Sequence, residues 1–176
     1  MGFKERLTKE WLFWDGGTGS VLQSWGLQAG ELPETWNINH PEKIVELNKG
    51  YLEAGCDIIN TNTFGANRLK YPDNLEEIVT KAVEHAKKAR ELTGRGDALI
   101  ALDLGPTGKL LEPLGDLSFD DAVDIYAEVI ENGTKAGADV ILIETMQDSY
   151  ELKAAVLAAK EHSHLPVCAT VVFDEK

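Results

Sequence analysis

Two acidic residues, Asp15 and Glu144, each directly follow a run of apolar residues. A carboxylate at the end of a buried strand loses hydration and needs a cation or a hydrogen-bond donor close by. Two such groups on one face suit a ligand with an ammonium group, since each charged hydrogen bond contributes about 1.5–3 kcal/mol. The structural alternative is that each carboxylate caps the helix that follows it, which is more plausible for Asp15 than for Glu144.

A glycine-rich turn, Gly16-Gly17-Thr18-Gly19-Ser20, follows Asp15. Such a turn leaves backbone N–H groups free to bind an anion, and a phosphate or a carboxylate would both fit. The turn has neither the Gly-Lys-Ser/Thr of a P-loop nor a true GxGxxG, so it gives little support to nucleotide binding. Without a ligand, the same composition serves as an ordinary turn after a strand.

An internal repeat relates residues 54–63, AGCDIINTNT, to residues 136–145, AGADVILIET, without a gap. Each copy reads as a helix end, a glycine turn and a buried strand that finishes on a polar residue followed by Thr. Asn62 corresponds to Glu144, so both are predicted to point to the same face, where Asn62 offers a neutral donor and acceptor. The alternative is that Asn62 and Thr63 only satisfy the hydrogen bonds of their loop.

The apolar pattern predicts which elements position these residues. Nearly continuous apolar runs, typical of strands covered on both faces, alternate with segments of helical period that have recognisable ends. Strand and helix alternate five times, which predicts an α/β fold of βα units. The predicted strands are 11–14, 58–59, 98–104, 140–143 and 167–173, and the predicted helices are 40–54, 75–93, 119–136 and 149–162.

The spacing of the repeat favours one architecture. The copies lie 82 positions apart, which makes two units of about 41 residues each, within the range of (β/α)8 barrels. We therefore expect residues 1–176 to form one domain, an incomplete (β/α)8 TIM barrel with about five parallel strands and four to five helices. A doubly wound sheet is the second candidate.

Active sites of parallel α/β folds lie at the C-terminal ends of the strands. Cys56 and Cys168 are predicted at the opposite ends, so the functional face is expected to contain no thiolate, and their spacing suggests no metal site. The five predicted strand ends are Asp15-Gly16-Gly17-Thr18-Gly19-Ser20, Thr61-Asn62-Thr63-Phe64-Gly65, Asp103-Leu104-Gly105-Pro106-Thr107-Gly108, Glu144-Thr145-Met146 and Asp174-Glu175.

Composition excludes several classes of function. The net charge of −13 repels phosphate backbones, which argues against nucleic-acid binding. No segment has the roughly 20 apolar residues of a membrane span, and the charged N-terminus lacks the apolar core of a signal peptide. We therefore expect a cytoplasmic protein that contacts neither nucleic acid nor membrane.

Several strings occur in order along the chain, namely WDGGTG (14–19), ETWN (34–37), YLEAG (51–55), DII (57–59), TNTFGAN (61–67), GPTG (105–108) and IETMQD (143–148), with the pair Ala154-Ala155. Together they resemble the homocysteine S-methyltransferase family, with closest similarity to the N-terminal homocysteine-binding domain of cobalamin-dependent methionine synthase. The resemblance implies a barrel that binds homocysteine at its C-terminal face. It implies that Asp15 and Glu144 hold the amino group, that Gly17 and Thr18 receive the carboxylate, and that Thr61 and Asn62 lie beside the amino acid.

The resemblance also implies cofactors. Zinc activates the homocysteine thiol by removing its proton, and methylcobalamin and methyltetrahydrofolate act through other modules. In the family the zinc ligands are cysteines that follow strands six and eight, positions that this sequence does not contain. We therefore expect the chain to lack the C-terminal half of the barrel. We expect it to be inactive in methyl transfer by itself and to take part in this reaction only within a complete methyltransferase.

Three hypotheses follow for function. The first is the homocysteine-binding part of a methyltransferase that forms methionine. The second is a substrate-binding subunit whose barrel is completed by a second chain, and the third is a barrel that binds a phosphate or a pterin through the turn at 15–20.

Overall fold

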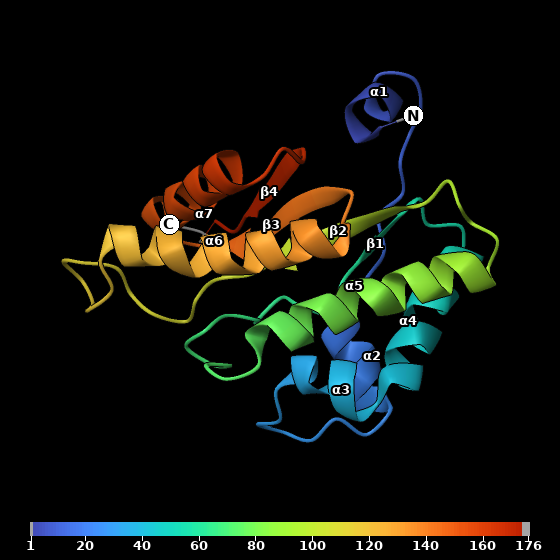
Figure 1. The fold of residues 1–176 in the computed structure, drawn as a ribbon, viewed down its shortest axis with the longest axis horizontal. Coiled ribbons are helices and arrows are strands. Elements are labelled where there is room, and N and C mark those ends of the chain that lie inside the picture. The colour runs from blue at the N-terminus through green and yellow to red at the C-terminus, as the bar shows by residue number, and fades with distance from the viewer. Residues whose placement is uncertain (1, 174–176) are drawn as a thin grey trace.

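The computed structural model describes residues 2–173 of the chain (Figure 1). Its strands are β1 (Ile58–Asn60), β2 (Leu99–Leu104), β3 (Val140–Met146) and β4 (Val167–Val171). Its helices are α1 (Phe3–Leu7), α2 (Thr18–Ser24), the 3-10 helix η1 (Pro33–Thr35), α3 (Trp36–Asn39), α4 (Pro41–Glu53), α5 (Leu75–Leu92), α6 (Phe119–Ala136) and α7 (Ser149–His162).

The four strands form one parallel sheet in the order β1-β2-β3-β4. The strand order therefore never reverses, as it must in a doubly wound sheet. Each of the helices α4, α5, α6 and α7 packs against the next, so the four form one layer along the sheet (Figure 1). Strands that follow in sequence order with helices on one side are the arrangement of a (β/α)8 barrel wall, and the predicted fold class is confirmed.

The four predicted helices are present as α4, α5, α6 and α7, with ends that differ from the prediction by two residues at most. Side-chain caps explain why the first residues of two of these helices could be predicted from the sequence. Ser118 accepts a hydrogen bond from the backbone N–H of Asp121 at the start of α6, and Asp148 accepts those of Tyr150 and Glu151 at the start of α7. The short helices α1, η1 and α3 were not predicted, because a single turn contains too few residues to display a period.

The predicted first strand, 11–14, is wrong as a buried strand. Only Trp14 pairs with β1, through an isolated parallel bridge to Ile58. The side chains of Trp11 and Phe13 are 90% and 67% exposed, so no second layer covers this segment. Likewise β4 is partly buried to exposed along its length instead of covered on both faces. The predicted end of the fifth strand, Asp174-Glu175, lies outside the described residues.

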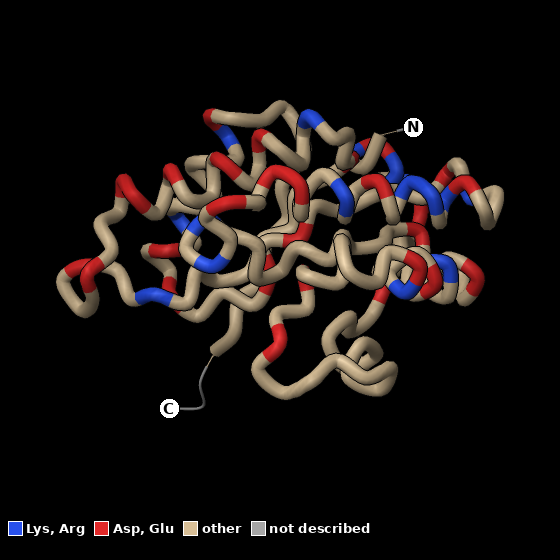
Figure 2. The backbone as a smooth tube through the Cα atoms, turned by 60° about the horizontal axis from the view of Figure 1, so that its bottom comes forward, with Lys and Arg blue, Asp and Glu red and all other residues tan. Residues whose placement is uncertain are grey.

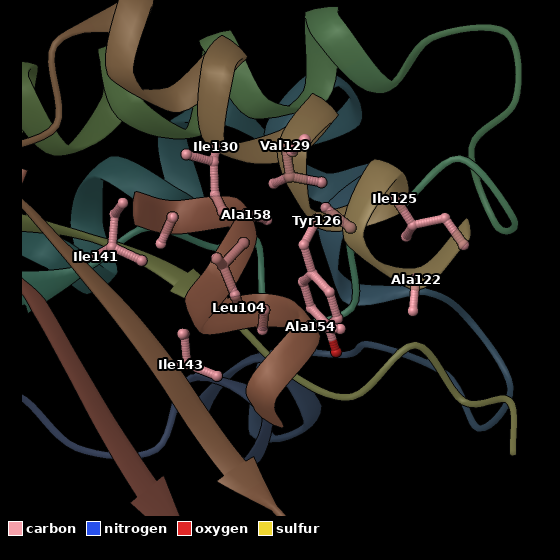
Figure 3. Packing of buried hydrophobic residues seen from close by; sticks show 14 of the residues in the cluster. Leu104, Ala122, Ile125, Tyr126, Val129, Ile130, Ile141, Ile143, Ala154 and Ala158 are labelled. Carbon is pink, nitrogen blue, oxygen red and sulfur yellow. The ribbon is translucent and has the colours of Figure 1, made fainter. Parts of the chain in front are cut away.

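Between the sheet and the helices lies the largest apolar cluster (Figure 3). It joins Leu104, Ile141 and Ile143 of the sheet to α6 and α7. The inner side of α7 consists of small residues, which lets this helix approach the sheet closely. These are Ala154, Ala155, Ala158 and Ala159, all fully buried.

A second cluster covers the other face of the sheet, toward the barrel interior. Alternate residues of neighbouring strands contribute to it, because side chains of a strand alternate between faces. Phe3 of α1 packs on this cluster and meets Trp14 edge to face, with ring centroids 6.1 Å apart. The strand residues of the cluster are Ile58, Leu99, Ala101, Val140 and Leu142.

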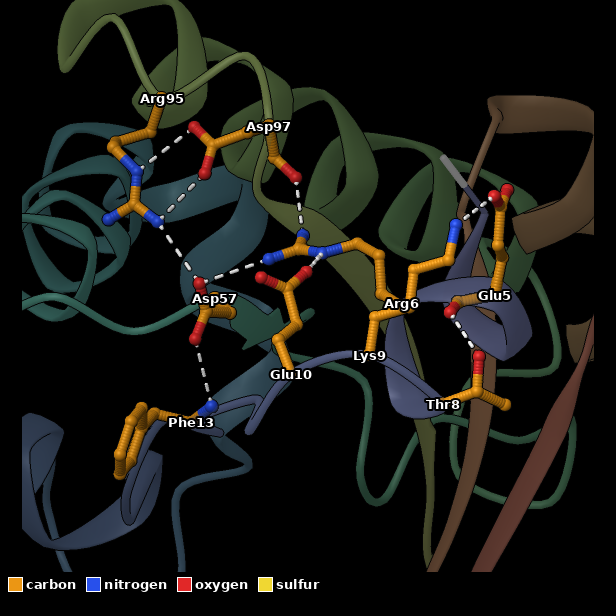
Figure 4. A network of polar contacts seen from close by, with 9 residues as sticks. All are labelled: Glu5, Arg6, Thr8, Lys9, Glu10, Phe13, Asp57, Arg95 and Asp97. Carbon is orange, nitrogen blue, oxygen red and sulfur yellow. Dashed lines mark hydrogen bonds and ion pairs between the residues drawn. The ribbon is translucent and has the colours of Figure 1, made fainter.

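The two copies of the internal repeat share a polar anchor at the N-terminal ends of the strands. Asp57 accepts the backbone N–H of Phe13, and Asp139 accepts that of Ile100. Each aspartate thereby ties its own strand to the chain segment that precedes it in the wall, and each also binds arginine (Figure 4 shows the network of the first copy). The partners are Arg6 and Arg95 for Asp57, and Arg90 for Asp139.

Acidic residues occur along all the long helices, with fewer Lys and Arg between them (Figure 2). This distribution fits the net charge of −13. Within residues 2–173, no helix is both long and apolar enough to cross a membrane.

A pair of glycine substitutions tests the packing of α6 on the sheet. A Cβ at Gly133 would overlap the methyl groups of Leu102, which is fully buried and cannot yield. We expect Gly133→Ala to lower the free energy of unfolding by about 1–3 kcal/mol, the usual cost of overpacking.

Gly50 in α4 is the matched control, because a Cβ there meets nothing within 4 Å. Gly50→Ala should raise the free energy of unfolding by about 0.5–1 kcal/mol through helix propensity. Urea denaturation of both variants measures the difference, and equal effects would contradict the described packing of α6.

Candidate active site

One cavity of about 760 Å³ opens at the C-terminal ends of the strands. Four carboxylates line it and Lys70 is the cation among its lining residues, so a cationic ligand is favoured there over an anion. The carboxylates are Asp15, Glu34, Asp103 and Glu144.

Asp15 enters the cavity from the segment that pairs with β1. Its Oδ2 accepts the backbone N–H of Asn60 at 2.7 Å, whereas its Oδ1 is buried without a hydrogen-bond partner. Burial raises the pKa of Asp15 to about 7, and the charge of Glu144 adds to the shift. Asp15 does not cap α2, which begins after Gly17 without a side-chain cap, so the structural alternative fails for Asp15.

Glu144 enters the cavity from the end of β3. Within the described residues its carboxylate has no hydrogen bond or ion pair, and burial raises its pKa. The ladder between β3 and β4 is irregular just beyond Ile143, and Thr145 adopts a left-handed conformation with φ of 60°. A β-branched residue rarely takes this conformation, so the backbone is strained directly beside Glu144. Because Asp148 caps α7, Glu144 is not a cap either.

The glycine turn forms another wall of the cavity. The N–H groups of Gly17 and Thr18 donate to no acceptor among residues 2–173, which leaves both available to a ligand. Tyr51 of α4 holds the turn by donating its hydroxyl to the carbonyl oxygen of Gly17 at 3.2 Å. A Cβ at Gly16 would lie 3.1 Å from the Tyr51 hydroxyl oxygen, so the Tyr51 side chain would have to shift by a few tenths of an ångström to admit one.

Asn62 lines the cavity, as its correspondence to Glu144 predicts, but much of its hydrogen-bonding capacity is used. Its amide group donates to the carbonyl oxygen of Pro33 at 2.8 Å and to Oδ1 of Asn37 at 3.0 Å. Its side-chain amide group therefore serves the loop, as the alternative reading expects, and only its side-chain oxygen remains for a ligand.

Thr61 is the one predicted site residue that the structure does not bring to the cavity lining. Its hydroxyl contacts that of Thr63 at 2.6 Å and accepts the backbone N–H of Asp103. Thr61 thus ties the end of β1 to β2 behind the lining.

Asp103, Asn60, Glu34 and Lys70 also line the cavity. Asp103 was expected on this face, at a predicted strand end, but without a role in the site, and the other three were not singled out as site residues. Asp103 had a readable signal, since Leu99, Ala101 and Asp103 alternate along β2 and the first two face the barrel interior. Glu34 belongs to the string ETWN, but no strand end or period indicated its place in the site, because it comes from η1.

The expectation that both cysteines lie away from the functional face is wrong for Cys168. Cys168 lies near the start of β4, as predicted, but it pairs in register with Leu142 and lines the cavity together with it. Burial raises the pKa of its thiol, so it is protonated near neutral pH. Within residues 2–173, no group of three His, Cys, Asp or Glu side chains is arranged to hold a metal ion.

A wall of consecutive βα units with a polar cavity at the strand ends defines the (β/α)8-barrel class. A sequence model of homocysteine S-methyltransferases matches residues 12–176, and the chain belongs to this family.

Similar proteins agree with this assignment. The methionine synthases of Mycobacterium tuberculosis and Mycobacterium leprae are each 30% identical to the chain, over 91% and 97% of its length. The chain spans only 15% and 16% of those two proteins.

Solved structures show the same fold. The homocysteine methyltransferase MmuM from Escherichia coli superposes with TM-scores of 0.75 in its apo form and 0.80 in its metallated form. Identity is 23% and 21%, and the matches cover 95% and 93% of this chain but 62% and 64% of the MmuM chains.

Asp15→Asn tests whether burial of the ionised Asp15 carboxylate destabilises the folded chain. The raised pKa means that the folded chain favours protonated Asp15, so stability is lost as the pH rises from the unfolded value near 3.8 through about 7. The amide cannot ionise and can still accept the N–H of Asn60. We therefore expect the substitution to raise the free energy of unfolding by on the order of 2–4 kcal/mol at pH 8 and by much less at pH 4.

Denaturation with urea at the two pH values measures this difference. Asp120→Asn, an exposed site on α6, is the control and should show no comparable pH-dependent gain. A destabilised Asp15→Asn variant at pH 8 would contradict the burial of this carboxylate.

Proposed function

We propose that the chain is the homocysteine-binding part of a homocysteine S-methyltransferase of the methionine synthase type, which transfers a methyl group to the homocysteine thiol. The observation that carries this proposal is the pair of carboxylates, Asp15 and Glu144, that face one cavity without a cationic partner among residues 2–173. Since an ammonium group supplies both the charge and the donors that they lack, an α-amino acid is the ligand class that fits.

The remaining lining suits the other end of an amino acid. In this proposal the free N–H groups of Gly17 and Thr18 bind the carboxylate of homocysteine. Asn62 contributes its side-chain oxygen beside the ligand, and Thr61 supports the site from behind through Asp103.

A phosphate ligand fits less well. Four carboxylates against one lysine make the cavity unfavourable for an anion, although the glycine turn alone would accept one.

The described residues do not provide a zinc site, so no step through zinc follows from them. In the proposed enzyme zinc is bound elsewhere in the barrel and supplies thiol activation, and cobalamin and folate modules supply the methyl group. The part of the reaction that belongs to residues 2–173 is binding and orienting the amino acid.

Titration calorimetry with L-homocysteine under reducing conditions tests the proposal. We expect the chain to bind homocysteine and Glu144→Gln to weaken binding at least about tenfold, the loss of one charged hydrogen bond. Glu84→Gln on the exposed side of α5 makes the same chemical change and should bind like the unsubstituted chain. Absence of homocysteine binding, or binding of inorganic phosphate in its place, would refute the proposal.

A further inference from the structure

Of the described carboxylates of the cavity, Asp103 is the one to which neither the proposed function nor the fold assigns a role. Its side chain is 5% exposed, lines the cavity, and has a buried Oδ1 without a hydrogen-bond partner. An unpaired buried carboxyl group costs stability, and native structures seldom retain one that nothing ever contacts.

The backbone around Asp103 holds this side chain in place. The N–H of Asp103 donates to the hydroxyl of Thr61 at 3.2 Å, and its carbonyl oxygen accepts the hydroxyl of Thr63 at 2.7 Å. The main chain of Asp103 is thus fixed on both sides to the segment that follows β1, while its carboxyl group is left to the cavity.

Glu34 shows what a structural carboxylate in the same cavity looks like. Its two oxygens accept the backbone N–H of Gly65 at 2.5 Å and the hydroxyl of Tyr71 at 2.8 Å. Both of its oxygens therefore stabilise the loop after β1. In contrast, Oδ1 of Asp103 has no hydrogen-bond partner in the described part of the chain, which separates Asp103 from Glu34 and groups it with Asp15 and Glu144.

We propose that Asp103 is a third carboxyl group of the amino-acid site, and that entry of a primary ammonium group into the cavity expels a proton from the cluster of Asp15, Asp103 and Glu144. This inference rests on the proposed function and extends it. A primary ammonium has three N–H donors, and the cluster offers one carboxyl group for each. The absence of a metal-like arrangement of these side chains among the described residues fits a larger, organic cation.

Proton release follows from the crowding of like charges. Three carboxylates in one partly enclosed cavity repel one another, which favours a protonated carboxyl group in the ligand-free cluster. Burial raises the pKa of Asp103 well above its usual range, and the charges of Glu144, Asp15 and Glu34 act in the same direction. The bound ammonium reverses this balance, and the proton passes to solvent. The other titratable groups that line the cavity are Lys70 and Cys168.

The prediction is a pH-dependent loss in Asp103→Asn. Because the ionised cluster binds the ammonium best, the affinity of the unsubstituted chain for L-homocysteine should rise from pH 6 to pH 8. Asp103→Asn should bind about tenfold more weakly at pH 8 and within about threefold of the unsubstituted chain at pH 6. Asp103→Ser is a second variant in case the first does not fold, with the same expected pattern.

Proton release separates binding from a structural role. Calorimetry at pH 8 in phosphate and in Tris, which differ in ionisation enthalpy, gives the protons released per homocysteine bound. The unsubstituted chain and the exposed control Asp120→Asn should release the same number, and Asp103→Asn measurably fewer. The analogue 4-mercaptobutanoate, which lacks the ammonium group, should cause no release.

The outcomes distinguish the two proposals. No homocysteine binding by the unsubstituted chain refutes the proposed function itself. Binding that depends on Glu144 but is unchanged in Asp103→Asn, with equal proton release at pH 8, refutes only the role of Asp103.

Discussion

The register of the parallel sheet determines which side chains reach the cavity, because every second residue of a strand faces the barrel interior. On β2 this series runs Leu99, Ala101, Asp103, and on β3 it runs Val140, Leu142, Glu144. Each series changes from apolar to acidic toward the C-terminal end. A slip of one residue would turn the acidic groups outward into the helix layer, so the fold and the polarity of the site depend on the same backbone pairing.

The order of the wall, the four long helices and the positions of Asp15 and Glu144 were predictable from the sequence. These features arise from local patterns, namely apolar period, helix caps and carboxylates that directly follow apolar runs. The strand expected at 11–14 failed for a non-local reason. Its apolar residues match those of a buried strand, but whether a second layer covers Trp11 and Phe13 depends on contacts that no local window contains.

The missed parts of the site have the same origin. Glu34 and Lys70 reach the cavity from irregular segments, where no period relates sequence position to direction. Cys168 lies near the start of its strand as predicted, but its access to the cavity depends on the pairing of β4 with β3, which the sequence of β4 alone does not contain. Asn62 shows the limit of the repeat argument, since the repeat gives its direction but not the partners, Pro33 and Asn37, that occupy its amide group.

The aspartate anchors at the N-terminal ends of the strands lie at the opposite end of the sheet from the cavity. Asp57 and Asp139 bind arginine and backbone N–H groups there, and neither lines the cavity. These arginine-bound attachments between neighbouring strands therefore lie apart from the cavity. Substitutions around the cavity can therefore change ligand preference during evolution, while the contacts of Asp57 and Asp139 continue to hold the strands of the wall together.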